Sequence, residues 1–179
     1  MKVFRLTTQV NRYQVFAPVS DEAVFRLRTD GETMEASWQP PAVFLTPPNR
    51  PRGDFLCGFY ETMITSPRAT VALLAQLQAA GEVLPLPFEG ETYALLNVTN
   101  VVDCLDLERA VTYPYVKSYV FKPDVLAELP SPIFKIPQTV RSEILVVEGL
   151  RNYGVHFQAL ISHHGLKGAM VSELWSDER

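Results

Sequence analysis

Proline is the residue that most constrains how this chain can fold. Of its 14 prolines, five lie between Pro40 and Pro51. Because proline lacks a backbone N–H and fixes φ, we expect this segment to form a loop without regular structure. The apolar run Val43-Phe44-Leu45 inside the loop is expected to pin it to the body of the protein.

The clearest helix signal follows at Ser66-Pro67. Serine is a favoured N-cap, proline suits the first helical position, and apolar residues then recur at helical spacing. Gly81 is expected to end this helix in a left-handed conformation. A second main helix is predicted over 142–152, with Ser142 as its cap, and Pro123-Asp124 is expected to open a short third helix.

Several other segments have the alternating or β-rich pattern of strands. Two prolines in 83–88 predict an edge position for that strand, and the turn signal Asp30-Gly31 predicts a hairpin between 23–28 and 33–38. The tail from Ser162 is polar. The remaining predicted strands are 2–10, 91–98, 101–105, 113–122, 133–136 and 155–161.

These elements predict an α+β fold with a mostly antiparallel sheet, two main helices and the proline-rich loop. With 179 residues, 47% of them hydrophobic, the chain has the size and apolar content of one unit spanning 1–179. No run approaches the roughly 18–20 apolar residues of a membrane span, and the N-terminus has no signal-peptide core. A cytoplasmic protein that does not bind membranes is therefore expected.

Residues suited to catalysis or metal binding are few. Cys57 and Cys104 lack metal-ligand spacing and are expected to be buried thiols. His163-His164, read as part of a strand, would point to opposite faces. Asp103 and Asp106 are weak candidates for an acid/base pair or a Mg²⁺ site, because such carboxylates more often cap turns. We therefore expect no catalytic residues, no metal and no cofactor.

Charge is distributed unevenly along the chain. The net charge of −4 disfavours binding to nucleic acid. The stretch 82–108 contains no Lys or Arg and has a charge of −6. Such a segment suits a basic protein partner, because complementary charge speeds encounter. Its acids are candidate partner-binding residues: Glu82, Glu89, Glu91, Asp103, Asp106 and Glu108.

Exposed aromatic side chains would supply the energetic anchors of such a contact. Trp38 beside the proline-rich loop and Tyr113, in the step Tyr113-Pro114-Tyr115, are the candidates adopted here, with Trp175 in the tail as a third. The alternative for each is that it packs against the protein's own core.

The order of motifs resembles a family of bacterial immunity proteins, the immunity protein eleven family. The similarity covers residues 54–161 and leaves 1–53 as a variable N-terminal part. It rests on Asp54-Phe55, Ser66-Pro67-Arg68-Ala69, 82–86, 93–98, 101–106, 133–136, Arg141-Ser142-Glu143 and the Gly154–Phe157 strand entry. It departs from the family pattern at 151–157 and at Ala110.

The resemblance implies a protein that binds and neutralises a cognate bacterial toxin in interbacterial competition, without catalysing a reaction. Two alternatives stay open. One is a small hydrolase that uses Asp103 and Asp106, or Cys57. The other is a regulatory binding module whose partner is not a toxin.

Overall fold

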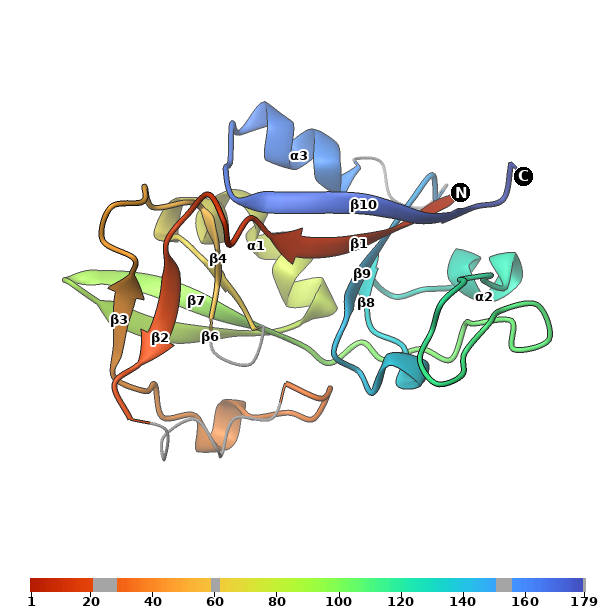
Figure 1. Ribbon diagram of the computed structural model, residues 1–179, viewed down its shortest axis with the longest axis horizontal. Coiled ribbons are helices and arrows are strands. Elements are labelled where there is room, and N and C mark those ends of the chain that lie inside the picture. The colour runs from red at the N-terminus through yellow and green to blue at the C-terminus, as the bar shows by residue number, and fades with distance from the viewer. Residues whose placement is uncertain (21–28, 59–61, 151–155, 179) are drawn as a thin grey trace.

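The first strand of the chain lies beside the last. In this computed structural model, which describes residues 1–20, 29–58, 62–150 and 156–178, β1 (Lys2–Thr8) pairs antiparallel with both β10 (Ala169–Ser176) and β9 (Ile144–Glu148). β8 (Ile133–Phe134) completes this four-stranded terminal sheet, in the order β10-β1-β9-β8. Figure 1 shows both termini at the same end of the molecule. The strand predicted over 2–10 is thus confirmed.

A second four-stranded antiparallel sheet, the hairpin sheet, has the order β4-β5-β7-β6. It contains β4 (Phe55–Cys57), β5 (Met63–Thr65), β6 (Gly81–Phe88) and β7 (Glu91–Val98). β6 lies at its edge, as the two prolines predicted, because their missing N–H groups need no partner there. The strand predicted over 91–98 is also confirmed, and it is central to this sheet.

The proline-rich segment contains one strand that we did not predict. β3 (Val43–Thr46) pairs antiparallel with β2 (Val15–Pro18) in a two-stranded ribbon. The four apolar or β-branched residues between the prolines are enough for a short ladder. Val43 and Leu45 pack against the core beside the hairpin sheet, so the expected attachment of this segment to the body is confirmed.

The described residues contain three α-helices. α1 (Pro67–Ala80) begins at Ser66, whose Oγ accepts a hydrogen bond from the Ala69 N–H at 3.1 Å, as predicted. The short α2 (Pro123–Ala127) opens at the expected proline. α3 (Phe157–His163) lies alongside β10 (Figure 1) and is one of two helices with seven or more residues in the described chain. The α+β class with mostly antiparallel strands is therefore confirmed.

Three hydrophobic clusters follow from the alternation of side chains along the strands. Ile144 and Val146 of β9 face a central cluster shared with α1, whereas Leu145 and Val147 face a cluster beneath the 101–129 segment. On β7, Leu96 faces the central cluster and Leu95 faces the ribbon. Both strands are buried on their two faces, so each sheet separates two cores.

The second main helix, predicted over 142–152, is wrong for 142–150, and residues 151 and 152 lie outside the described residues. Residues Ile144–Glu148 form strand β9, and its four apolar residues face alternate sides of the sheet. A short run of buried apolar residues fits a helix and a strand equally well by spacing alone. The β-branched Ile144, Val146 and Val147 favour the strand.

Two further predictions, for the segment 155–161 and for the tail from Ser162, also differ from the structure. Part of the strand predicted over 155–161 is α3, in which Phe157 is buried and Leu160 and Ile161 are partly buried, the i, i+3, i+4 pattern of a helix. The tail read as polar forms β10, an edge strand half exposed to solvent. Polar residues are compatible with such an edge, which explains the error.

Other predicted strands are largely irregular segments. Residues 35–37 form a 3₁₀ helix instead of a strand, and 23–28 lie outside the described residues. The segments 101–105 and 113–122 contribute only isolated bridges, Val101–Lys135, Leu105–Phe121 and Val111–Ser118. The strand predicted over 133–136 is confirmed for Ile133 and Phe134. In the described parts of the chain no helix is long and apolar enough to cross a membrane.

Gly81 ends α1 for a reason other than the one we expected. Its φ of 161° is extended, not left-handed. The constraint is close approach, since a Cβ atom at this position would lie 2.1 Å from the Asn97 carbonyl oxygen and 2.6 Å from the Thr99 nitrogen. Glycine therefore allows the chain to pass directly from α1 into β6.

Replacement of Gly81 by alanine should therefore destabilise the fold by about 2–3 kcal/mol, because backbone must move to admit the methyl group. Urea denaturation would measure the change in the free energy of unfolding. The matched control is Gly90→Asn in the β6–β7 turn, where φ is 82° and nothing lies near a Cβ. Asparagine tolerates this conformation, so the control should stay within about 0.5 kcal/mol of wild type. Equal losses in the two variants would contradict the role assigned to Gly81.

Candidate docking cleft

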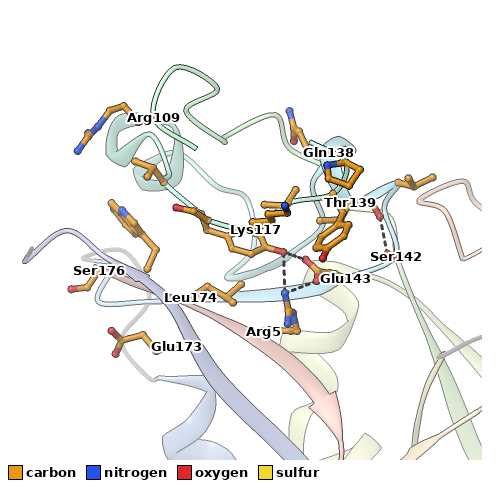
Figure 2. A pocket seen from close by; sticks show the side chains of 18 residues that line it. Arg5, Arg109, Lys117, Gln138, Thr139, Ser142, Glu143, Glu173, Leu174 and Ser176 are labelled. Carbon is orange, nitrogen blue, oxygen red and sulfur yellow. Dashed lines mark hydrogen bonds and ion pairs between the residues drawn. The ribbon is translucent and has the colours of Figure 1, made fainter. Parts of the chain in front are cut away.

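A cleft of about 1080 Å³ lies over the face of the terminal sheet that faces away from α1. Figure 2 shows the side chains that surround it. One wall is the C-terminal half of β10, a second is the loop 114–120, and a third is the turn 138–143. The 101–129 segment packs on this face over β8 and β9, and the cleft occupies the neighbouring area, where Trp175 meets Phe121 at 5.8 Å between ring centroids.

The cleft floor is a closed network of three polar side chains. The alternation of β1 places Arg5 on the same face as Val3, where its Nη2 lies 2.6 Å from the Glu143 carboxylate and donates to the Tyr119 hydroxyl at 3.0 Å. Tyr119 in turn donates to Glu143 at 2.6 Å. Burial, followed by this bond to Glu143, raises the Tyr119 pKa to about 12. These bonds hold the three side chains of the floor together, although the Arg5 Nε is buried with no hydrogen-bond partner among the described residues.

The cleft rim has exposed apolar side chains. Tyr115 is 67% exposed and Val140 is 85% exposed, and both line the cleft. Tyr113, close by in the chain, is 87% exposed. Val140 has a φ of 53° and Arg141 a φ of 57°. A β-branched residue in this left-handed region is a rare and strained choice.

Two cations line the cleft without a close acidic partner in the lining. Lys117 makes no ion pair with the described residues, and its Nζ lies 5.5 Å from the centroid of the Tyr115 ring. Arg109 approaches the Asp106 carboxylate only at 4.0 Å, and its side chain is 72% exposed. Both cations are therefore available at the surface of the cleft.

The two acids of the lining are engaged in ion pairs. Glu143 binds Arg5 in the floor, and Glu173 binds Lys2 at 3.2 Å. The acidic residues predicted to bind a partner, which all lie in the stretch 82–108, do not line the cleft. The charge that the lining leaves uncompensated is consequently positive.

The structure separates five of those six acids into two groups, and Glu82 lies apart from both near the start of β6. The β6–β7 hairpin, with Glu89 and Glu91, and the irregular segment with Asp103, Asp106 and Glu108 lie at opposite ends of the long axis (Figure 1). The sequence interval 82–108 therefore does not form one acidic face.

Several of these carboxylates already have partners within the protein. Glu89 is paired with Arg52, and Asp103 accepts a hydrogen bond from the Gln138 amide at 2.7 Å. Asp106 accepts from the backbone N–H of Glu108 at 3.1 Å, as expected of a turn-capping residue. The side chain of Glu91 lies 3.5 Å from the Tyr93 hydroxyl.

Glu82 is the most fully engaged of the six. Its carboxylate accepts hydrogen bonds from the backbone N–H groups of Met34 and Glu35, at 2.8 and 2.9 Å, and from the Asn97 amide at 2.8 Å. Burial opposes ionisation, but these bonds outweigh it and lower the Glu82 pKa. Glu82 thus holds the 3₁₀ segment against the hairpin sheet.

Lysine 135 holds the same N-terminal segment from the other side. It is only 3% exposed, its Nζ donates to the Thr29 carbonyl, and Arg141 donates to the neighbouring Asp30 carbonyl at 3.1 Å. Burial lowers the Lys135 pKa to about 8, although Asp30 acts in the opposite direction. The segment 29–38 therefore lies on the body through side-chain contacts instead of a strand ladder.

The predicted aromatic anchors have different environments. Trp38 donates its indole N–H to the Pro85 carbonyl at 2.8 Å and packs beside the hairpin sheet. Tyr113 is almost fully exposed on the same irregular segment as Tyr115. Trp175 is partly buried against Phe121 and lines the cleft. The structure brings Trp175 and the 113–115 step to one region and leaves Trp38 in another.

The residues considered for chemistry are dispersed. Cys104 is buried as expected, with a pKa raised to about 12 by burial, whereas Cys57 is only partly buried. His163 and His164 lie at the end of α3, not on a strand as we expected, and their rings meet at 4.9 Å. Within the described residues, no group of three His, Cys, Asp or Glu side chains is arranged to hold a metal ion.

Sequence reasoning named Trp175 and the step Tyr113-Pro114-Tyr115 as candidate anchors, but it missed three other lining residues, Arg5, Lys117 and Val140. They come from segments far apart in the chain. Only Arg5 had a local signal, the alternation that assigned it to the face of Val3. Comparison with known proteins adds no assignment, since no family model matches the sequence and no curated protein does.

The buried Lys135 predicts a pH dependence of stability. Between about pH 8 and 10.5 the unfolded chain binds a proton that the folded protein does not, so the free energy of unfolding rises with pH. Relative to a Lys135→Met variant, wild type should gain up to roughly 3 kcal/mol across this window. Urea denaturation at several pH values would measure the difference. Lys122→Met, which removes an exposed lysine, is the control, and a difference curve of the same shape for it would contradict the assignment.

Proposed function

We propose that this protein is a non-catalytic binding protein that neutralises a bacterial toxin by docking it at the cleft on the terminal sheet. The single observation that carries the docking surface is Val140, a strained and 85% exposed β-branched residue at the rim. Strained residues persist where the surroundings impose them and cluster at functional sites.

The rim has the composition of a protein contact. Exposed aromatic and aliphatic side chains near a concave, well-ordered surface are the usual energetic anchors of an interface. Tyr115 and Val140 are such side chains, and Trp175 supplies an indole from the wall formed by β10. The hydrogen-bonded floor of Arg5, Glu143 and Tyr119 supports a preformed surface, which lowers the ordering cost of binding.

The toxin as partner comes from the resemblance to the immunity protein eleven family, carried by residues 54–161. A protein of that kind acts by occluding its toxin or holding it inactive. The hydrolase alternative has less support from the geometry, because Asp103 and Asp106 are engaged with Gln138 and with backbone N–H groups, as turn-capping residues are.

Co-expression with the toxic protein encoded beside this chain's gene tests the proposal. Cells that express both should survive, and purified wild-type protein should bind that toxin in isothermal titration calorimetry. A neighbouring gene with no toxic product, or full protection without any binding, would contradict the proposal.

The variant Val140→Gly separates binding from stability. Glycine adopts the left-handed φ without strain, so the free energy of unfolding should be unchanged or higher by up to about 1 kcal/mol. Loss of the exposed side chain should weaken toxin binding about tenfold. Val71→Ala on α1, where Val71 is 79% exposed, is the matched control and should bind like wild type. If Val140→Gly also binds like wild type, the cleft is not the docking surface.

A further inference from the structure

We infer that the cleft receives an acidic segment of the partner protein, with an apolar side chain seated against Tyr115, Val140 and Trp175. This inference rests on the proposed docking function and adds the chemistry of the partner. It reverses the expectation from the sequence, which was a basic partner for the acidic stretch 82–108.

The charge of the lining is the first argument. Its two acids are neutralised, Glu143 by Arg5 and Glu173 by Lys2. The ammonium of Lys117 has no ion-pair partner among the described residues, and the guanidinium of Arg109 is mostly exposed. An incoming carboxylate would meet these two cations before any free anion of the lining, and such complementarity sets both encounter rate and partner choice.

The position of the acidic residues is the second argument. Glu89 is ion-paired with Arg52, and Asp106 lies 4.0 Å from Arg109. Glu82 and Asp103 accept hydrogen bonds from neutral groups and keep their negative charge, but they do not line the cleft. Of Asp103, Asp106 and Glu108, only Glu108 has an exposed side chain that makes no hydrogen bond or ion pair with the described residues. Sequence charge therefore overstates the negative potential that a partner in the cleft would meet.

The combination of groups around the cleft is the third argument. Its volume of about 1080 Å³ is close to the upper end of small-molecule pockets, so the occupant is argued from chemistry and not from size. The apolar rim adds a seat for a hydrophobic side chain next to the cations. A peptide segment provides carboxylates and an apolar anchor together, which a small anion does not.

Single-stranded nucleic acid also combines negative charge with flat apolar groups. The net charge of −4 and the acids at 103, 106 and 108 beside the cleft oppose a polyanion more than a short segment with a few carboxylates. The observations favour the peptide, and nucleic acid is an outcome of the test.

Tryptophan fluorescence gives a readout at the cleft itself. The chain has two tryptophans, so the full-length Trp38→Phe variant leaves Trp175 as its only one. The probes are tryptophan-free ten-residue peptides: one with four Glu around a central Phe-Leu pair, and a second with Lys in place of each Glu. A twelve-nucleotide single-stranded DNA is the third probe. We expect a saturable change in Trp175 emission with the acidic peptide, weakened by salt.

Charge reversal at the rim completes the test. Lys117→Glu, combined with Arg109→Glu, should weaken binding of the acidic peptide about tenfold and improve binding of the basic peptide. Lys122→Glu, an exposed cation outside the lining, is the control and should leave both unchanged. Preference of the wild type for the basic peptide or for the DNA, or no response to any probe, would overturn the inference.

The same variants separate this inference from the proposed function. If Val140→Gly weakens toxin binding but the double charge reversal does not, the cleft docks the toxin, and the inference that an acidic segment enters it is wrong. If neither variant changes toxin binding, the docking surface itself is wrong. If Glu108→Lys slows association with the toxin and the double charge reversal does not, the partner is basic, as the sequence alone suggested.

Discussion

The pairing of β1 with both β10 and β9 is the interaction on which the rest of the structure depends. It joins the two ends of the chain, and the N-terminal amine lies 2.6 Å from the Asp177 carboxylate. The terminal sheet separates the central cluster from the cluster beneath 101–129, and β10 packs partly buried side chains against both of them. The same pairing builds the cleft, because β1 supplies Arg5 to the floor and β10 supplies a wall.

Charge in this protein is organised by contacts in space and not by position in the sequence. The interval 82–108 has six acids and no cation, yet the fold places it at both ends of the molecule and engages much of it internally. Glu82 holds the 29–38 segment, and Glu89 is paired with Arg52 from a distant part of the chain. The cleft lies beside part of this interval, yet its lining exposes two cations, Lys117, which has no ion pair with the described residues, and Arg109, whose distance to the Asp106 carboxylate is 4.0 Å. Counting charges along a chain is therefore a poor guide to the potential at a site built from several segments.

Local signals predicted the elements whose causes are local. The cap at Ser66, the alternation of β1 and the prolines of β6 each act within a few residues, and each prediction is confirmed. Within the predicted segments 142–152 and 155–161, the described residues were assigned the wrong type, because a run of four or five apolar residues has no decisive period. The cleft was beyond prediction for a different reason. Arg5, Tyr119, Glu143 and Trp175 meet only through the sheet order, which no short window of sequence contains.

At Val140 the backbone conformation and the side chain have separate roles. Hydrogen bonds hold the turn around it, from the Val140 N–H to the Pro137 carbonyl at 2.9 Å and from the Ser142 hydroxyl to the Thr139 carbonyl at 2.7 Å. They fix the left-handed backbone, but they make no use of the Val140 side chain. The left-handed conformation costs a valine about 1–2 kcal/mol, which the lower backbone entropy cost of valine relative to glycine offsets only in part. At 85% exposure the side chain buries too little surface to recover the rest within the described fold. Because the turn needs the conformation and not the side chain, the isopropyl group has its clearest physical use in contact with another molecule.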